Sequence, residues 1–272
     1  MAISDWAAVA TGQLSHADEL LDWARTIMDS TLVSAVDTLP ESTRRIAAYH
    51  FGWVDADGTP AAGPAGKSLR PTLVLLCAAA VGGRPEDAID VAAAVELVHN
   101  FSLIHDDVMD RDRTRRHRPT VWAVFGVPEA ILLGDALLTL AFDVLRSAPA
   151  EQAARLRCAV QQLCDGQSAD VAFERRAEVS MAEYAAMARG KTAALFSCVT
   201  ALGGLCGNGT TRQVEFLRRF GEELGVAFQL ADDLMGIWGD PQRAGKPVCS
   251  DAKIRDRIFA SPWCASKTAP RC

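Results

Sequence analysis

Three aspartates within one short segment, Asp106, Asp107 and Asp110, have the type and spacing to bind a divalent cation. On a helix, which turns by about 100° per residue, Asp106 and Asp110 stack on one face and Asp107 lies beside them. Carboxylates packed so closely repel one another, and Mg²⁺ is a suitable counter-charge because it takes hard oxygen ligands and commonly joins one or two carboxylates to substrate phosphates. An apolar run, residues 95–104, leads directly into the aspartates. We therefore interpret the cluster as a magnesium and diphosphate site rather than a solvated acidic helix end.

A second acidic pair, Asp232 and Asp233, follows another apolar run at residues 226–231. Facing helices of a bundle can direct functional side chains into one cavity. We expect the two acidic groups to face each other there and to share a set of metal ions.

Basic residues that could bind a diphosphate occur at three further places. The segment Gly66-Lys67-Ser68-Leu69-Arg70-Pro71 begins a helix, so that backbone N–H groups, Lys67 and Arg70 can converge on an anion. Its spacing is not that of a P-loop. Lys191 lies in an otherwise apolar helix, where a lysine is costly unless it has an anionic partner or its amine reaches solvent.

The third basic place is an arginine cluster directly after the first acidic group. Its members are Arg111, Arg113, Arg115, Arg116 and Arg118. We interpret Arg111, Arg113 and Arg118 as part of a solvated basic loop.

The apolar pattern is helical almost throughout and predicts an all-α fold without a convincing strand. We expect helices over residues 18–39, 42–53, 69–81, 86–110, 128–147, 150–173, 181–205 and 211–235. Glycine and proline make residues 55–66 a loop. One bundle-like helical domain should span residues 1–251, followed by an irregular and disordered tail over 252–272.

Composition excludes some classes of protein. A net charge of −6 argues against binding to nucleic acid, because no overall basic field is present. The eight cysteines show no C-x-x-C pair and no zinc-ligand spacing, which favours reduced thiols. There is no secretory leader and no apolar stretch long enough to span a bilayer, so we expect a soluble, cytoplasmic protein with no transmembrane segment.

In their order and spacing, several of these segments resemble the trans-type polyprenyl diphosphate synthases, over about residues 60–251. The matching segments are Gly66-Lys-Ser-Leu-Arg-Pro, His99-Asn-Phe-Ser-Leu-Ile-His-Asp-Asp-Val-Met-Asp, Arg115-Arg116, Gly134-Asp-Ala-Leu, Lys191-Thr192 and Phe228-Gln-Leu-Ala-Asp-Asp. The resemblance implies an all-α isoprenoid-synthase bundle around a central cavity, usually dimeric. Such enzymes join isopentenyl diphosphate to an allylic diphosphate with the help of two to three Mg²⁺ ions, and the short-chain members make geranylgeranyl or farnesyl diphosphate.

The resemblance also implies roles for single residues. Mg²⁺ would be held by Asp106, Asp107, Asp110, Asp232 and Asp233. The allylic diphosphate would be contacted by Arg115, Lys191 and Lys246. Isopentenyl diphosphate would be bound by Lys67, Arg70, His99 and Arg116. Polar positions near the reacting carbons are matched by Thr192 and Gln229.

Product length in such enzymes depends on the depth of an apolar tunnel below the first aspartates. Phe101 and Ser102 lie one turn before Asp106, and the ring of Phe101 could form the floor of that tunnel. We therefore expect C15 to C20 products, with C20 geranylgeranyl diphosphate preferred. The alternative is that Phe101 is simply a core aromatic.

The chain departs from the family pattern at three places. Gly236 stands where a third acid is usual, and Asp240 is its nearest substitute. His117 replaces a glycine after the arginine pair, which we interpret as a tolerated loop change. After Asp251 the chain continues for only 21 residues, where the family has several more helices. We expect lower stability and lower activity than those of a longer relative.

Two other functions stay open from the sequence. A class I terpene cyclase also ionises a prenyl diphosphate, although it does not need the residues assigned to isopentenyl diphosphate. A degenerate, non-catalytic subunit would account for Gly236 and the short C-terminal segment.

Overall fold

The computed structural model describes residues 16–61, 68–176 and 178–238, and within them the predicted all-α fold is confirmed. The α-helices are α2 (Ala17–Val36), α3 (Glu41–His50), α4 (Leu69–Ala80), α5 (Ile89–Met109), α6 (Val121–Phe125), α7 (Val127–Val144), α8 (Ala150–Phe173), α9 (Met181–Ala188), α10 (Ala194–Cys206) and α11 (Thr211–Trp238). Short 3₁₀ turns cover Pro85–Ala88 and Leu145–Ser147, and a π-helical turn covers Arg189–Ala193. Among these described residues, no helix is both long and apolar enough to cross a membrane.

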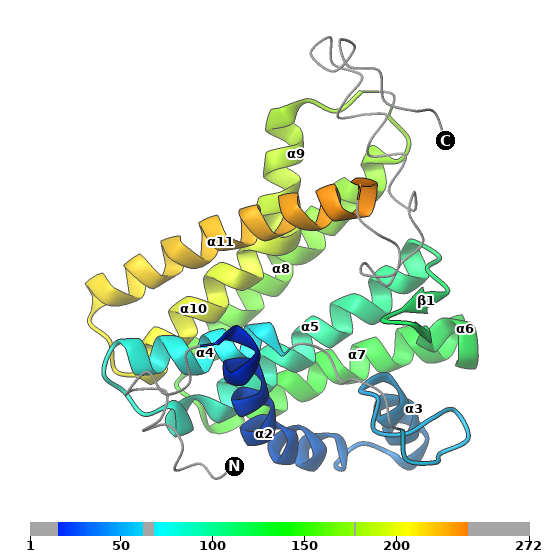
Figure 1. Ribbon diagram of the computed structural model, residues 1–272, viewed down its shortest axis with the longest axis horizontal. Helices are drawn as coiled ribbons and strands as arrows, with labels where there is room; N and C mark the ends of the chain where they lie inside the picture. Colours follow the sequence, from blue (N-terminus) through cyan, green and yellow to red (C-terminus); the bar gives the residue numbers. More distant parts are fainter. Residues whose placement is uncertain (1–15, 62–67, 177, 239–272) are drawn as a thin grey trace.

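The helices form two groups that meet at α4 (Figure 1). α5 packs most extensively against α7 and also against α4 and α2, whereas α10 packs against α11, α4 and α8. α5 is buried on almost every face over residues 91–98, because this stretch is apolar all round except for Glu96. A helix of this kind belongs at the centre of the molecule, and its C-terminal end carries the first aspartates.

Small residues bring α4 and α10 into close contact. A Cβ atom on Gly203 of α10 would lie 2.4 Å from the carbonyl oxygen of Val74 on α4. Only a hydrogen fits at that position, so the two backbones can touch directly. This contact joins the two groups of helices.

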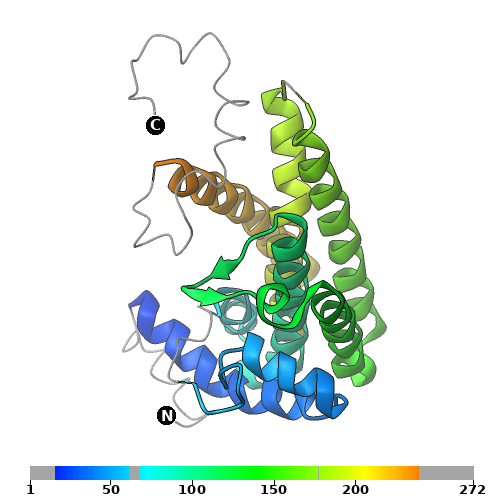
Figure 2. The ribbon, with the colours of Figure 1, turned by 90° about the vertical axis from the view of Figure 1, so that its right-hand side faces the viewer.

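The sequence-based prediction was wrong in two local respects. The single helix expected over residues 181–205 is three segments, α9, the π-helical turn and α10. A two-stranded hairpin, β1 (Thr114–Arg115) and β2 (Arg118–Pro119), and the short helix α6 follow α5, where no element was expected. Strands of two residues are too short to show an alternating pattern. Figure 2 shows the hairpin projecting from the helices around it.

Candidate functional site

The first acidic group lies at the C-terminal end of α5, as predicted. Asp106 and Asp107 belong to the helix, and Asp110 follows its last residue. Burial raises the pKa of Asp110 to about 6; the neighbouring Lys191 opposes this rise, and the charges of Asp106, Asp170 and Asp112 add to it. A carboxyl group with so high a pKa, beside two other acids, lies where an added cation is stabilising.

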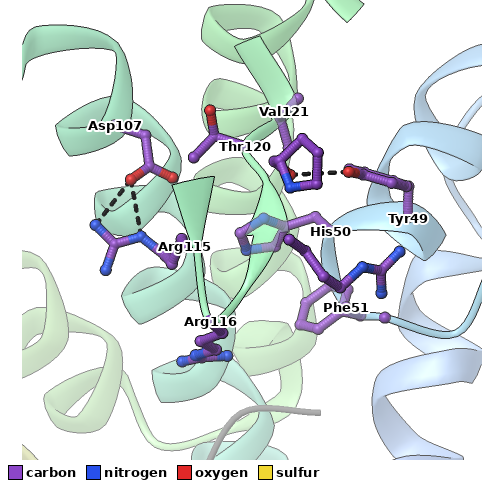
Figure 3. Close-up of a pocket in the computed structure, with 11 residues that line it drawn as sticks. Tyr49, His50, Phe51, Asp107, Arg115, Arg116, Thr120 and Val121 are labelled. Atoms are coloured by element: carbon purple, nitrogen blue, oxygen red, sulfur yellow. Dashed lines mark hydrogen bonds and ion pairs between the residues drawn. The ribbon is translucent and has the colours of Figure 1, made fainter. Parts of the chain in front are cut away.

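Asp107 is directed toward the hairpin and is 3% exposed. Its Oδ1 accepts a hydrogen bond from Nε of Arg115 at 2.8 Å and lies 2.8 Å from Nη2 of the same guanidinium (Figure 3). A two-point contact of this kind orients both groups. Arg115 is therefore held beside the aspartates by Asp107.

The tight turn of the hairpin determines where its arginines lie. Arg116 and His117 form the turn with φ angles of 51° and 63°, both left-handed, as a type I′ turn requires. Tyr49 on α3 donates a hydrogen bond to the carbonyl oxygen of Pro119 at 2.8 Å and so ties the hairpin to the helix. Behind the hairpin lies a cavity of about 50 Å³, lined in part by His50, Asp107, Arg115 and Arg116 (Figure 3).

Asp170 on α8 is a site residue that the sequence reasoning missed. Its Oδ2 accepts a hydrogen bond from the Nζ of Lys191 at 2.5 Å. Burial alone would lower the pKa of Lys191, but Asp170, Asp106 and Asp110 together raise it. Lys191 therefore has the anionic partners that its apolar surroundings demand, and it links α8 to the first acidic group.

A contact between two glycines places Lys191. A Cβ atom on Gly166 of α8 would lie 2.0 Å from the backbone nitrogen of Lys191, and one on Gly190 would lie 3.0 Å from the carbonyl oxygen of Gln162. The π-helical turn can rest on α8 only because both positions lack side chains. Such turns occur frequently at functional sites.

The second acidic group lies on α11. Asp232 is exposed, whereas Asp233 is buried and accepts hydrogen bonds from Tyr184 on α9 and from Nε2 of Gln229 at 2.8 Å. Gln229 in turn accepts a hydrogen bond from Thr192. Burial raises the pKa of Tyr184. The hydrogen bond to Asp233 and the charges of Asp233, Asp170 and Asp232 raise it further, so acids of both α8 and α11 lie near this tyrosine.

A separate group of basic and polar side chains lies on α4 and α5. Nη1 of Arg70 is 3.1 Å from Nε2 of His99, and the guanidinium carbon of Arg70 lies 4.6 Å from the ring centre of Phe196. Burial lowers the pKa of His99 well below its ordinary value, and Arg70 and Arg116 add to this. His99 is therefore neutral, and its Nε2 accepts from Arg70.

A buried carboxylate, that of Glu96, lies near these side chains. Glu96 accepts a hydrogen bond at Oε1 from Asn100 at 3.1 Å, and Oδ1 of Asn100 is 2.9 Å from Nε2 of His50. Burial lowers the pKa of Arg70 to about 10, and nearby Glu96 opposes this. The resemblance did not single out Glu96, although a lone acid in the apolar run of α5 was a visible signal.

The two residues assigned to product length are both buried. Phe101 is 6% exposed, and its ring centre lies 5.0 Å from that of His105, edge to face. Ser102 donates a hydrogen bond to the carbonyl oxygen of His99 in its own helix at 2.8 Å. Their assignment to product length stays a prediction. Lys67, Lys246, Asp240 and the tail at 252–272 lie outside the described residues.

The donor atoms suit Mg²⁺. Among the described residues, no three histidine, cysteine or acidic side chains already form a metal-binding group. Mg²⁺ does not require one, because it retains waters and uses one or two carboxylates together with substrate phosphates. The raised pKa of Asp110 and the cationic Lys191 between the acids are what a site for added positive charge and an anion would show.

A helical protein with acidic residues on α5, α8 and α11 and two groups of basic side chains has the form of a diphosphate-processing enzyme. The chain matches the polyprenyl synthetase family over residues 54–264 and belongs to that family.

Proteins similar to this chain carry related names. A geranylgeranyl diphosphate synthase of Mycobacterium tuberculosis is 50% identical, with 87% of this chain and 69% of that protein covered. A (2E,6E)-farnesyl diphosphate synthase of the same organism is 45% identical, with 90% and 69% covered. The crystal structure of a polyprenyl synthetase from Streptomyces coelicolor superposes with a TM-score of 0.83 at 44% identity, covering 93% of this chain and 77% of that one.

Proposed function

We propose that this protein is a short-chain trans-prenyltransferase, which condenses isopentenyl diphosphate with an allylic diphosphate and uses two to three Mg²⁺ ions. The observation that carries the proposal is the presence of two groups of basic side chains. Arg115 and Lys191 lie with the acids, whereas Arg70 and His99 lie together on α4 and α5. Two diphosphate substrates need two such groups, and a cyclase with a single substrate does not. The names of the similar proteins support the same reaction.

The first cationic group would bind and activate the allylic substrate. Lys191 and Arg115 donate hydrogen bonds to the departing diphosphate and offset its growing charge. Asp106, Asp107, Asp110, Asp232 and Asp233 would hold Mg²⁺, which would supply Lewis-acid stabilisation of that leaving group. Asp170 is a further candidate ligand, because it lies with Lys191 beside the first acids.

The second group would bind isopentenyl diphosphate through Arg70, His99, Arg116 and Lys67. Its double bond attacks the allylic cation, and the departed diphosphate can take the final proton, so no strong protein base is needed. Thr192 follows Lys191 in the π-helical turn, and Gln229 contacts Thr192 from α11. Their oxygen atoms can face positive charge at the reacting carbons.

The proposed function extends to the product, the oligomeric state and the location of the protein. The product is C15 to C20, with C20 preferred, and Phe101 forms the floor of the tunnel. The protein is a homodimer, which is supported by exposed apolar residues on α7, Val127, Ile131 and Leu132, the last of them 66% exposed. It acts in the cytoplasm, in line with five cysteines that are free thiols among the described residues.

The test is incubation of the purified protein with Mg²⁺, labelled isopentenyl diphosphate and each of the C5, C10 and C15 allylic diphosphates. We expect elongated diphosphates ending at C15 or C20. Arg70→Leu should raise the KM for isopentenyl diphosphate, Lys191→Leu should raise that for the allylic substrate, and Arg84→Leu, at an exposed arginine, should change neither. Alcohol or hydrocarbon without isopentenyl incorporation would indicate a cyclase. No product and no Mg²⁺-dependent substrate binding would reject the proposal.

A further inference from the structure

Tyr184 is a buried polar residue for which neither the sequence motifs nor the proposed mechanism gives a role. It lies on α9, is 3% exposed, and its hydroxyl donates a hydrogen bond to Oδ2 of Asp233, 49 residues away on α11. A buried phenol normally finds a hydrogen-bond partner. Here the partner is an acid of the candidate site.

The start of α9 directs Tyr184 inward. Ser180 caps the helix, since its Oγ accepts from the backbone of Glu183 at 3.3 Å, and Glu183 Oε2 accepts from the backbone of Ser180 at 2.9 Å. Glu183 also pairs with Arg176 at 2.7 Å on the exposed side. The next residue, Tyr184, therefore turns away from this exposed pair and toward α11.

Asp233 then determines which way the Gln229 amide faces. An ionised carboxylate only accepts hydrogen bonds, so Gln229 must present its NH₂ group to Asp233, and Nε2 lies 2.8 Å from Oδ1. The amide oxygen is left to accept from Thr192. With the amide reversed, an oxygen would face Asp233 and the hydrogen bond would be replaced by repulsion.

That orientation matters for the proposed reaction. The oxygen is the negative end of the amide dipole, and a dipole that is already oriented toward a developing cation stabilises it without reorganisation. A reversed amide would present N–H groups, the positive end, to the same volume. Tyr184 and Gln229 use different oxygens of Asp233, so the tyrosine holds the carboxylate in the rotation that Gln229 needs.

We propose that Tyr184 is a positioning residue, which acts through Asp233 to hold the oxygen of the Gln229 amide toward the reacting carbons. The inference rests on the proposed function, because it assigns the volume beside Thr192 and Gln229 to the allylic cation. Tyr184 itself touches neither substrate.

The test compares Tyr184→Phe, Gln229→Leu and the double variant in steady-state kinetics with saturating Mg²⁺. Tyr184→Phe should lower kcat by about tenfold or more and leave both KM values within about twofold, because the loss falls on the transition state. If Tyr184 acts through Gln229, the double variant should be no slower than Gln229→Leu alone. Tyr184→Phe should also release more allylic alcohol, formed when water rather than isopentenyl diphosphate captures the cation.

Ser197→Ala is the matched control. It removes another largely buried hydroxyl hydrogen bond to α11, from Ser197 Oγ to the carbonyl oxygen of Arg218 at 3.0 Å. It should cost comparable stability in urea unfolding and leave kcat and the alcohol fraction unchanged. If Tyr184→Phe does not fold, Tyr184→His and Tyr184→Met give the second test. The imidazole can donate a hydrogen bond to Asp233 and should keep more of kcat than the methionine, which cannot.

Effects of Tyr184→Phe and Gln229→Leu on kcat that multiply in the double variant would overturn the inference. An equal loss of kcat in Ser197→Ala, or equal kcat values in Tyr184→His and Tyr184→Met, would also overturn it. In each of these cases the wild-type protein would still incorporate isopentenyl diphosphate, so the proposed function would stand. A wild-type protein that incorporates no isopentenyl diphosphate would instead reject the proposed function.

Discussion

Asp107 and Arg115 face each other across the end of α5, with Oδ1 of the aspartate 2.8 Å from two guanidinium nitrogens of the arginine. Helix α5 carries the aspartate, and the hairpin carries the arginine. The pair therefore decides where the hairpin sits relative to the other aspartates. Through this contact a structural ion pair becomes part of the proposed diphosphate site.

Replacing Asp107 by alanine should both destabilise the protein and weaken substrate binding. Removal of one partner of a buried ion pair costs about 3 kcal/mol, because the other charge stays desolvated. Urea unfolding should show that loss, and the KM for the allylic diphosphate should rise as Arg115 loses its position. Asp22→Ala is the control, since it breaks an exposed pair with Arg25 and should change stability by less than about 1 kcal/mol. Equal stability of the two variants would contradict the role of the buried pair.

His117→Gly should stabilise the hairpin. A side chain in the left-handed region costs about 1–2 kcal/mol, and the greater freedom of glycine in the unfolded chain offsets about 0.5–1 kcal/mol of that. A net gain of about 0.5–1 kcal/mol in urea unfolding is expected. Asn208→Gly, at a similar φ of 58°, should gain less because asparagine tolerates this conformation. A destabilised His117→Gly protein would show that the His117 side chain makes a needed contact, and that the substitution is more than a tolerated loop change.

The sequence predicted the features that depend on residue spacing within one segment, and it did not predict contacts between distant segments. Asp106, Asp107, Asp110 and the helices around them follow from spacing and periodicity within one segment. Asp170 was missed because its partner Lys191 lies 21 residues away and nothing in the pattern of α8 distinguishes it from an ordinary exposed acid.

The other differences have the same origin. Arg189-Gly-Lys-Thr-Ala has no unusual composition for a helix, and its π-helical turn arises from the close contact of Gly190 with α8. The hydrogen bond from Tyr184 to Asp233 joins two helices whose packing no single-chain pattern specifies. The acids of the two motifs could be predicted, but Asp170 and Tyr184, whose partners lie on other elements, could not.

Stability should fall in mild acid because the folded protein holds the partly buried His50 in its neutral form. Burial lowers the pKa of His50 to about 4, although its Asn100 hydrogen bond opposes this. The unfolded chain therefore takes up a proton first as the pH falls below about 6.5, and up to about 3 kcal/mol of stability is lost between there and pH 4. In His50→Gln, the urea midpoint should fall less between pH 6.5 and pH 4 than in wild type. Above pH 7 the urea midpoints of the two proteins should change in parallel. If they also change in parallel between pH 6.5 and pH 4, His50 is not the group whose protonation destabilises the protein.

Gly166→Ala should destabilise the protein, although alanine normally favours a helix by about 0.5–1 kcal/mol. The new Cβ would lie 2.0 Å from the backbone nitrogen of Lys191, so α8 and the π-helical turn must separate, at a cost of about 1–3 kcal/mol. The ion pair between Lys191 and Asp170 should weaken, and the KM for the allylic diphosphate should rise. Ser168→Ala, at an exposed position of the same helix, should be neutral or slightly stabilising. A stabilised Gly166→Ala protein would show that α8 and the π-helical turn can move apart at Gly166 without a loss of stability.

Phe101→Ala separates the two interpretations of this buried ring. If the ring forms the floor of the product tunnel, its removal should extend the products beyond C20, as measured by chromatography of the dephosphorylated alcohols. If Phe101 is only a core aromatic, the products should stay the same and the protein should lose about 3–5 kcal/mol of stability. Leu97→Ala, at a fully buried position one turn earlier on α5, is the matched control and should lose stability without changing product length. Because Phe101 packs edge to face on His105, which lies directly before Asp106, a change in product length confined to Phe101→Ala would place the floor of the tunnel one turn below the aspartates.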